Sequence, residues 1–266
     1  RVFYIADYFK RLGCDIVFIG RTYKDMPNRE YFSSIHGQKS NLTKYLRFVV
    51  RMKLVYYGIK KIISDQPTHL YIRSDYLSFV FGLLVYFTKI KLIYETHGMT
   101  YKELQYSNAS KLKIRIRKYI EESIINRFSD SIVVNSYGTK EYLISKYSMT
   151  NNIFCILNGI NTDVIDNIEP IYKSDIPAIG FIGNWERWIR IEDLLMVSKL
   201  TNKVQIVIVG KGEGYNKYKN RYPDVKFTGL VSREVAMGYL HSFDVCISPW
   251  DDSEIFKEKS ARKTFE

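Results

Sequence analysis

Two glutamates close this chain, Glu258 and Glu266, with seven residues between them, one of which is Lys263. A carboxylate accepts hydrogen bonds from hydroxyl groups, and a lysine offers a point charge to a phosphate. The segment follows an apolar run at 244–248, which predicts a strand that ends at Pro249. Two acidic residues at this spacing occur by chance in most soluble proteins, so the pair has meaning only together with the motifs before it.

Two glycine-containing turns are candidates for binding phosphate, and one of them contains Gly210 and Gly212. This turn follows the strand predicted at 205–209, where backbone amides would approach a phosphate. Its spacing differs from the GxGxxG motif, which excludes a dinucleotide cofactor. An ordinary strand-to-helix turn explains the same residues equally well.

The other turn begins with Gly183 and Asn184, after the strand predicted at 178–182, and Arg187 and Arg190 follow it. Arginine suits bidentate contacts with phosphate. The alternative is two solvent-facing arginines at the start of a helix. The position of the turn at the carboxyl end of a strand favours phosphate binding.

His97 is the candidate residue of the first half of the chain. It follows the strand predicted at 91–95 and precedes Gly98. A histidine at the carboxyl end of a parallel strand is expected to face the ligand cleft. The alternative is a histidine that only stabilises a turn.

Lysine and arginine outnumber aspartate and glutamate, which gives a net charge of +12 and a pI of about 9.4. This excess suggests an anionic partner, and a solvated basic surface is the alternative. Read as a helix, 111–118 and the next turn place Leu112, Ile116, Tyr119 and Ile120 on one stripe, with lysines and arginines elsewhere. This pattern fits either a helix that lies on an anionic bilayer or a packed helix with solvated lysines.

The three cysteines lie far apart, and no zinc-type spacing of cysteine and histidine appears. We therefore expect neither a disulfide framework nor structural zinc, and a reducing, cytoplasmic setting. The longest apolar run, 76–87, is shorter than the ~20 residues that span a bilayer, which predicts a buried helix. We expect no signal peptide.

Helix-period segments alternate with short apolar runs along the whole chain. This alternation predicts an α/β fold with two Rossmann-like domains that face a cleft. We expect one domain at 1–165, a linker at 166–177 and the other domain at 178–266. Both ends of the sequence fall inside helix patterns, so we expect both ends of the chain to be truncated.

Seven segments follow one another in a set order along the chain: 132–136, 156–161, 183–190, 209–212, 225–229, 244–249 and 260–266. In this order they resemble a GT-B retaining glycosyltransferase of glycosyltransferase family 4, the glycosyl transferases group 1 type. Asn184 and Arg190 depart from the arginine and lysine that the family has there.

The resemblance implies a retaining hexosyltransferase that moves a sugar from a nucleotide-sugar donor to an acceptor hydroxyl, in cell-surface polysaccharide or glycolipid assembly. It implies that 1–165 binds the acceptor and that 178–266 binds the nucleotide-sugar. His97 and Glu258 would be the catalytic residues, Lys263 would contact the donor phosphates and Glu266 the ribose. The implied donor-binding residues are Gly183, Asn184, Arg187, Arg190, Gly210, Gly212, Lys263 and Glu266.

We expect no cofactor and no metal, because cations would stabilise the departing diphosphate and Asp251-Asp252 lacks the Asp-x-Asp spacing. The acceptor would be a sugar or a lipid-linked molecule, with the inner membrane face as a further anionic partner. One alternative is a nucleotide-sugar epimerase of the same fold, with Glu95 and His97 as acid and base. Another is a non-catalytic GT-B partner subunit, which Asn184 favours. Nucleic-acid binding ranks last, because no recognised module is present.

Overall fold

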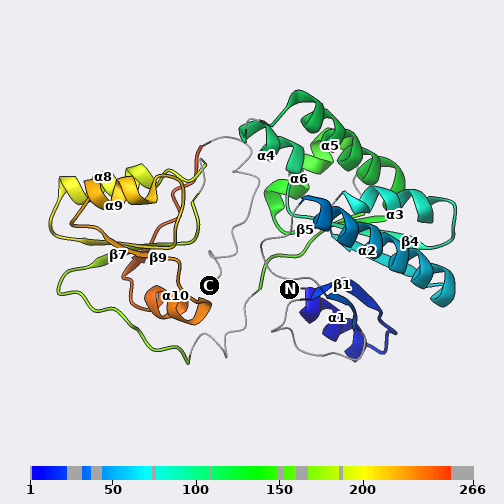
Figure 1. The fold of residues 1–266 in the computed structure, drawn as a ribbon, viewed down its shortest axis with the longest axis horizontal. Coiled ribbons are helices and arrows are strands. Elements are labelled where there is room, and N and C mark those ends of the chain that lie inside the picture. Colours follow the sequence, from blue (N-terminus) through cyan, green and yellow to red (C-terminus); the bar gives the residue numbers. More distant parts are fainter. Residues whose placement is uncertain are drawn as a thin grey trace. The chain divides into compact units, whose positions relative to one another are not determined.

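The computed structural model describes two compact units, unit 1 (Arg1–Leu157) and unit 2 (Asn158–Glu266). The division lies before the linker that we predicted at 166–177, and that segment falls within unit 2. Both units are α/β folds with parallel strands, and we describe each by itself (Figure 1). The structure describes residues 2–22, 32–36, 44–73, 76–107, 109–148, 152–159, 167–185 and 188–252.

Unit 1 begins with helix α1 (Val2–Arg11), which ends as predicted before Gly13, a glycine in the left-handed region at φ +80°. Strand β1 (Phe18–Thr22) pairs in parallel with β2 (Phe32–His36), and the long helix α2 (Lys44–Asp65) packs against both strands. The sequence did not indicate β2, because a Ser-Ser pair interrupts its apolar pattern.

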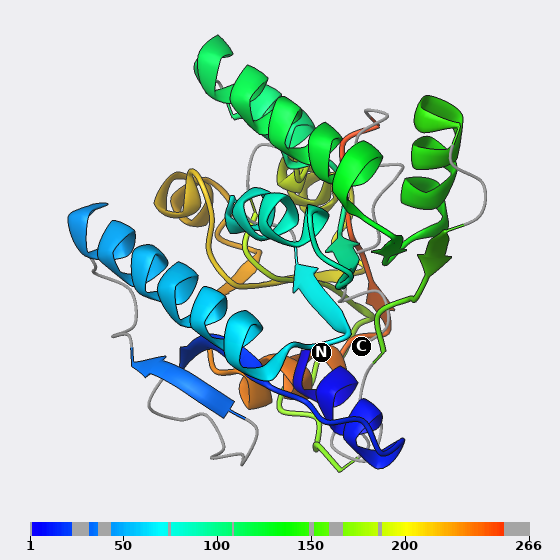
Figure 2. The ribbon, with the colours of Figure 1, turned by 90° about the vertical axis from the view of Figure 1, so that its right-hand side faces the viewer.

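A second sheet holds the candidate residues of unit 1, and its four strands run parallel in the order β3-β4-β5-β6. The strands are β3 (His69–Arg73), β4 (Lys91–Thr96), β5 (Ser131–Val134) and β6 (Ile153–Cys155). The helices between them are α3 (Leu77–Tyr86), α4 (Thr100–Tyr106), α5 (Lys111–Ser123) with the π-helical turn η1 (Ile124–Phe128), and α6 (Tyr137–Tyr147). Figure 2 shows α5 and η1 as one continuous helical segment.

One face of β4 and β5 forms the core of unit 1. Tyr94, Ile132 and Val134 alternate along the strands with residues of the opposite face, so their side chains share one face. The opposite face is covered too, because Glu95 and Val133 are also buried. The first three side chains pack with Ile124 of η1 and Leu143 of α6. Burial of these apolar side chains holds the strand ends, and the candidate residues with them, in fixed register.

The apolar run that we predicted to be a buried helix forms α3, but only one of its faces is buried. Ser78, Gly82 and Val85 are buried, whereas Leu83 and Tyr86 are exposed. The prediction of a buried helix therefore holds for one face only, because an apolar sequence does not reveal which face lacks a packing partner. Within the described residues no helix is long and apolar enough to cross a membrane.

Unit 2 is a three-layer sandwich (Figure 1), with α8 and α9 on one face of a sheet and α10 on the other. Its parallel strands follow the order β10-β7-β8-β9. They are β7 (Ala178–Ile182), β8 (Gln205–Val209), β9 (Lys226–Gly229) and β10 (Val245–Cys246). The helices are α8 (Ile191–Leu200), α9 (Tyr215–Arg221) and α10 (Arg233–Leu240).

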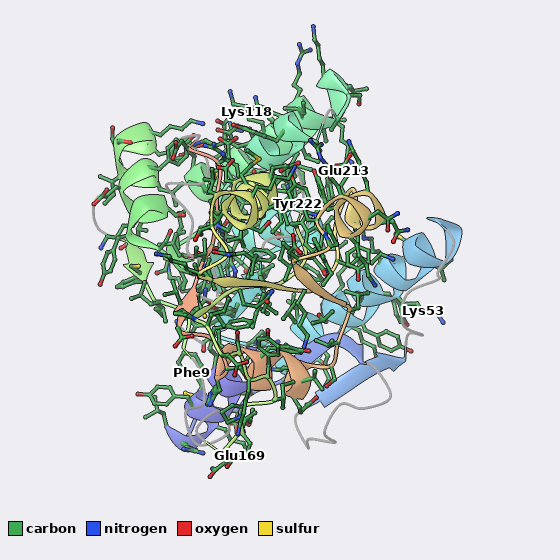
Figure 3. All side chains as sticks on the ribbon, turned by 90° about the vertical axis from the view of Figure 1, so that its left-hand side faces the viewer. Phe9, Lys53, Lys118, Glu169, Glu213 and Tyr222 are labelled. Atoms are coloured by element: carbon green, nitrogen blue, oxygen red, sulfur yellow. The ribbon has the colours of Figure 1, made fainter. Side chains whose placement is uncertain are left out.

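Helix α9 is absent from our sequence-based prediction, and its composition explains why. The segment Tyr215–Arg221 is mostly polar and has no apolar period that would indicate a helix. It is anchored by tyrosines: Tyr215 packs on the core, Tyr218 donates a hydrogen bond to Glu192 of α8, and Tyr222 after the helix is buried. Figure 3 labels Tyr222 at this position.

Candidate functional site

The register of β3 and β4 brings four polar side chains of unit 1 to one face of the sheet. Arg73 pairs with Glu95 in the ladder, and side chains two residues apart on a strand share a face. Tyr71, Arg73, Glu95 and His97 therefore lie on the same side of the sheet. Diagonal neighbours on such a face lie within reach of long side chains. The Tyr71 hydroxyl accordingly donates to Glu95 Oε2 at 2.7 Å, and Arg73 Nη2 lies 3.2 Å from His97 Nδ1.

Glu95 is the centre of this network, because its side chain is fully buried. Its Oε1 lies 2.6 Å from His97 Nε2, and its Oε2 accepts from Tyr71. A buried carboxylate is stable only where hydrogen bonds or cations compensate its charge. Tyr71 and His97 supply that compensation, and in return Glu95 fixes the imidazole ring.

The partners of His97 determine its tautomer. Arginine only donates hydrogen bonds, so His97 Nδ1 must be the acceptor and the ring proton lies on Nε2, facing Glu95. Both ring nitrogens thus contact protein groups. The structure places His97 at the strand end where the sequence predicted it, and its contact with a donor sugar stays a prediction.

A buried ion pair holds the turn that follows His97. Arg117 Nε donates to Glu121 Oε1 at 2.8 Å, and the two side chains are 3% and 1% exposed. Glu121 also accepts the backbone N–H groups of Thr100 and Tyr101, at 3.1 and 3.2 Å, in the first turn of α4. The pair therefore caps α4 and fixes the segment between His97 and that helix.

The same pair carries opposing electrostatic effects. Burial raises the pKa of the Glu121 carboxyl, and the nearby Arg117 charge, the Tyr101 amide and other hydrogen bonds offset only part of that increase. The Arg117 guanidinium also stacks over the Tyr76 ring, 4.7 Å from its centroid.

Asn135 follows β5 at the same edge of the sheet and is 3% exposed. Among the described residues, none donates a hydrogen bond to its Oδ1 atom. The next residue, Ser136, caps α6 by accepting the Thr139 N–H at 3.1 Å. Asn135 thus presents a buried acceptor beside the turn that contains His97.

In unit 2 the two glycine turns pack against each other at the carboxyl ends of β7 and β8. Gly183 and Gly210 adopt φ values of +134° and +127°, which other residues rarely adopt. A Cβ atom on Gly210 would overlap the Gly183 carbonyl, and one on Gly212 would overlap the Trp185 carbonyl and ring. This packing alone accounts for glycine at 210 and 212, so their contact with phosphate stays a prediction.

Of the remaining predicted site residues, the structure describes Asn184 and Arg190. Asn184 is exposed directly after Gly183. Arg190 precedes α8 and contacts Asp193 Oδ2 at 2.7 Å in a pair whose side chains are both about half exposed. The free energy of such a surface pair is only about 0–1 kcal/mol, so a phosphate would displace it readily. Arg187, Glu258, Lys263 and Glu266 lie outside the described residues.

Sequence reasoning missed Tyr71, Arg73 and Asn135. Arg73 directly follows the strand that we predicted at 69–72, and Asn135 ends the strand predicted at 131–135, so their strand-end positions were an available signal. Within the part of the chain that the structure describes, no group of three or more His, Cys, Asp or Glu side chains is placed to hold a metal ion.

Solved structures that are similar to this chain include glycosyltransferases of the GT-B type. Sucrose-phosphate synthase from Thermosynechococcus elongatus aligns with a TM-score of 0.68 at 18% identity, over 91% of this chain and 67% of its own. HepE from Anabaena, in complex with UDP-glucose, aligns with a TM-score of 0.54 at 14% identity, over 81% of this chain and 65% of its own. The lipopolysaccharide outer core galactosyltransferase WaaB aligns with a TM-score of 0.55 at 16% identity, over 86% of this chain and 62% of its own.

This chain thus spans between 62% and 67% of the length of these three proteins. Among curated protein sequences no significant match is found. The sequence model of Glycosyltransferase Family 4 matches residues 1–164, which is more than half of the chain. That match agrees with the two Rossmann-like units and their parallel strand order. The chain therefore belongs to Glycosyltransferase Family 4.

Proposed function

We propose that this protein transfers a hexose from a nucleotide-sugar to an acceptor hydroxyl, with retention of the anomeric configuration. The observation that carries the proposal is the family match over residues 1–164. The position of the glycine turns of unit 2 agrees with the proposal, because they follow the carboxyl ends of β7 and β8, where ligands of open parallel sheets bind. HepE, solved with UDP-glucose, supports a nucleotide-sugar as donor.

The chemical requirement of this reaction is to stabilise the departing diphosphate while positive charge develops on the sugar ring. We assign the diphosphate to Arg190 and Lys263, which offer cations without a metal. Glu266 binds the ribose and Glu258 lies beside the sugar. Asn184 provides a neutral amide in place of a third cation, so the diphosphate depends more strongly on Arg190 and Lys263.

The test is transfer by the intact protein from UDP-, GDP- and ADP-sugars, with the anomeric configuration of the product read by NMR. Retention and activity in EDTA are expected. An inverted product contradicts the assigned stereochemistry, and loss of activity in EDTA contradicts the metal-free scheme. A protein that binds no nucleotide would instead fit the non-catalytic subunit.

The geometry of Glu95 and His97 does not favour the epimerase. An epimerase needs acid and base groups on opposite sides of the sugar. Glu95 is fully buried and hydrogen-bonded to His97, so the two form one pair on one side of the sheet. They would reach the same face of any bound sugar.

For the acceptor we propose a lipid-linked molecule at the anionic inner face of the membrane. Helix α5 supports this, because three residues of its predicted apolar stripe are exposed: Leu112 by 66%, Ile116 by 48% and Tyr119 by 58%. The fourth, Ile120, packs against the core of unit 1. The side of α5 that packs on the protein carries Arg117 and Glu121 instead. Four exposed cations flank the stripe, namely Lys111, Lys113, Arg115 and Lys118, the last of which Figure 3 labels.

Each lysine or arginine near an anionic bilayer contributes about 1 kcal/mol of attraction, which salt weakens. We therefore expect co-sedimentation with vesicles that contain phosphatidylglycerol, but not with neutral vesicles. Replacing Lys111, Lys113 and Arg115 by glutamate should abolish it. Lys203, Lys217 and Lys219 are exposed cations of unit 2, and replacing them by glutamate gives a control with the same change of charge. Equal loss in both triple variants would refute a specific role for α5.

A further inference from the structure

The Arg73 guanidinium has an unusual position for an exposed side chain, because a hydrogen-bond network around the buried Glu95 holds it. Its Nη2 donates to His97 Nδ1 at 3.2 Å, and His97 is held in turn by the fully buried Glu95. The Tyr71 hydroxyl donates to the other carboxylate oxygen of Glu95 and completes the chain of hydrogen bonds. The orientation of Arg73 is therefore set before any ligand arrives, which lowers the entropic cost of binding one.

Most N–H donors of the Arg73 side chain have no partner among the described residues. A guanidinium has five N–H donors. In the described part of the chain, the contact with His97 is the one side-chain hydrogen bond that Arg73 makes, and no described carboxylate pairs with it. Planar guanidinium groups with adjacent N–H donors suit phosphate and carboxylate, which accept two such bonds at once.

Asn135 provides a second, independent indication of a ligand. Thr96 pairs with Val134 in the β4–β5 ladder, so His97 and Asn135 are the next residues along these neighbouring strands. The Asn135 side chain is 3% exposed, and no described residue donates to its Oδ1. A buried acceptor without a donor is unfavourable, and a ligand hydroxyl would satisfy it.

We propose that Arg73 and Asn135 form an acceptor subsite for a hydroxylated anion, a sugar that carries a phosphate or a carboxylate. Arg73 binds the anionic group and Asn135 Oδ1 accepts a hydroxyl. Glu95 and His97 are positioning residues, which act through Arg73. Two strand spacings separate β3 from β5, roughly 10 Å, which a charged monosaccharide spans together with the two side chains. This inference rests on the proposed transferase function and names the class of its acceptor.

Binding at this subsite is measurable without turnover, because His97 lies next to it. In protein with ¹⁵N-labelled histidine, the His97 ring signals are assigned by their loss in His97→Gln. From the contacts with Arg73 and Glu95 we expect Nδ1 to accept a hydrogen bond and Nε2 to carry a proton. Glucose 1-phosphate and glucuronate are the probes, and they distinguish phosphate from carboxylate. Glucose lacks the charge, and inorganic phosphate lacks the hydroxyls.

At least one of the two charged sugars should shift the His97 signals, and glucose should not. Arg73→Gln removes the charge but keeps an N–H donor for His97, and it should weaken that binding by about tenfold or more. The matched control is Arg127→Gln, which removes another exposed arginine, from η1, and should leave the affinity unchanged. Asn135→Leu should weaken binding of the charged sugar but not of inorganic phosphate.

The proposal is refuted if neither charged sugar shifts the His97 signals, or if Arg73→Gln binds as tightly as the wild type. This outcome is separable from failure of the transferase function. All three tryptophans, Trp185, Trp188 and Trp250, belong to unit 2, so their fluorescence reports nucleotide binding there. A response to UDP, GDP or ADP without any shift at His97 rejects the subsite and leaves the proposed function standing.

Discussion

Replacing Arg117 by methionine tests how the turn after His97 is held. The substitution keeps most of the side-chain volume but leaves Glu121 buried without its cation. Removing one partner of a buried ion pair costs about 3–5 kcal/mol, because the other charge stays uncompensated. Glu121 retains hydrogen bonds from the Thr100 and Tyr101 amides, so we expect a loss of about 3 kcal/mol, at the lower end of that range.

A pair on the same helix provides the matched control. Lys118 lies 3.9 Å from Glu122 with the same spacing of four residues, but its side chain is 48% exposed. Lys118→Met should change the stability by at most about 0.5 kcal/mol. Urea unfolding followed by far-UV circular dichroism measures both variants, and tryptophan fluorescence reports unit 2 separately. Equal effects of the two substitutions would refute the argument from burial.

The pH dependence provides a second check on Arg117→Met. Burial raises the pKa of Glu121 in the folded protein, so its favourable contribution is complete below the unfolded value of 4.5 and is lost as pH rises through the folded pKa. Without Arg117 the folded pKa rises further. The destabilisation should therefore be larger at about pH 7.5 than at about pH 4.5. A penalty that does not change with pH would show that it arises from packing and not from charge.

Three further predictions concern the glycine turns, the sheet edge and the donor. Gly210→Ala should destabilise unit 2 by roughly 1–3 kcal/mol, because φ is +127° and the Gly183 carbonyl blocks the added Cβ. In the control Gly159→Ala the added Cβ meets no atom, so its effect should be near neutral. Equal melting temperatures of the two variants would refute this. Burial raises the pKa of Asp130, but hydrogen bonds from Lys91 and the Leu92 amide outweigh this effect, so the folded pKa is lowered. Asp130→Asn should therefore destabilise the protein at neutral pH, and this difference from the wild type should vanish as pH falls through the folded pKa. Thermal unfolding at neutral pH and at a pH below the folded pKa measures it. Glu266→Ala should weaken nucleotide binding by about tenfold or more, and unchanged affinity by calorimetry would reject its contact with the ribose.

The sequence was a good guide to the alternation of helices and strands, because apolar periodicity determines it. Strands β4, β5, β7 and β8 were predicted from continuous apolar runs, which parallel strands covered on both faces require. It was a poor guide where tertiary contacts replace periodicity. Strand β2 has a polar centre, and α9 is held by tyrosines and not by an aliphatic stripe.

The candidate site was predictable only one residue at a time. A strand end identified His97, and glycines identified the turns of unit 2, because each of these signals is local in sequence. The contact between Arg73 and His97 depends on the ladder that pairs Arg73 with Glu95, and no sequence pattern fixes that register. The contact between Glu95 and His97 does not depend on register, because the two residues lie two positions apart in the chain and share a face of the sheet. The same two strand ends would form a different site if β3 were displaced by one residue, because Arg73 would then face the opposite side of the sheet.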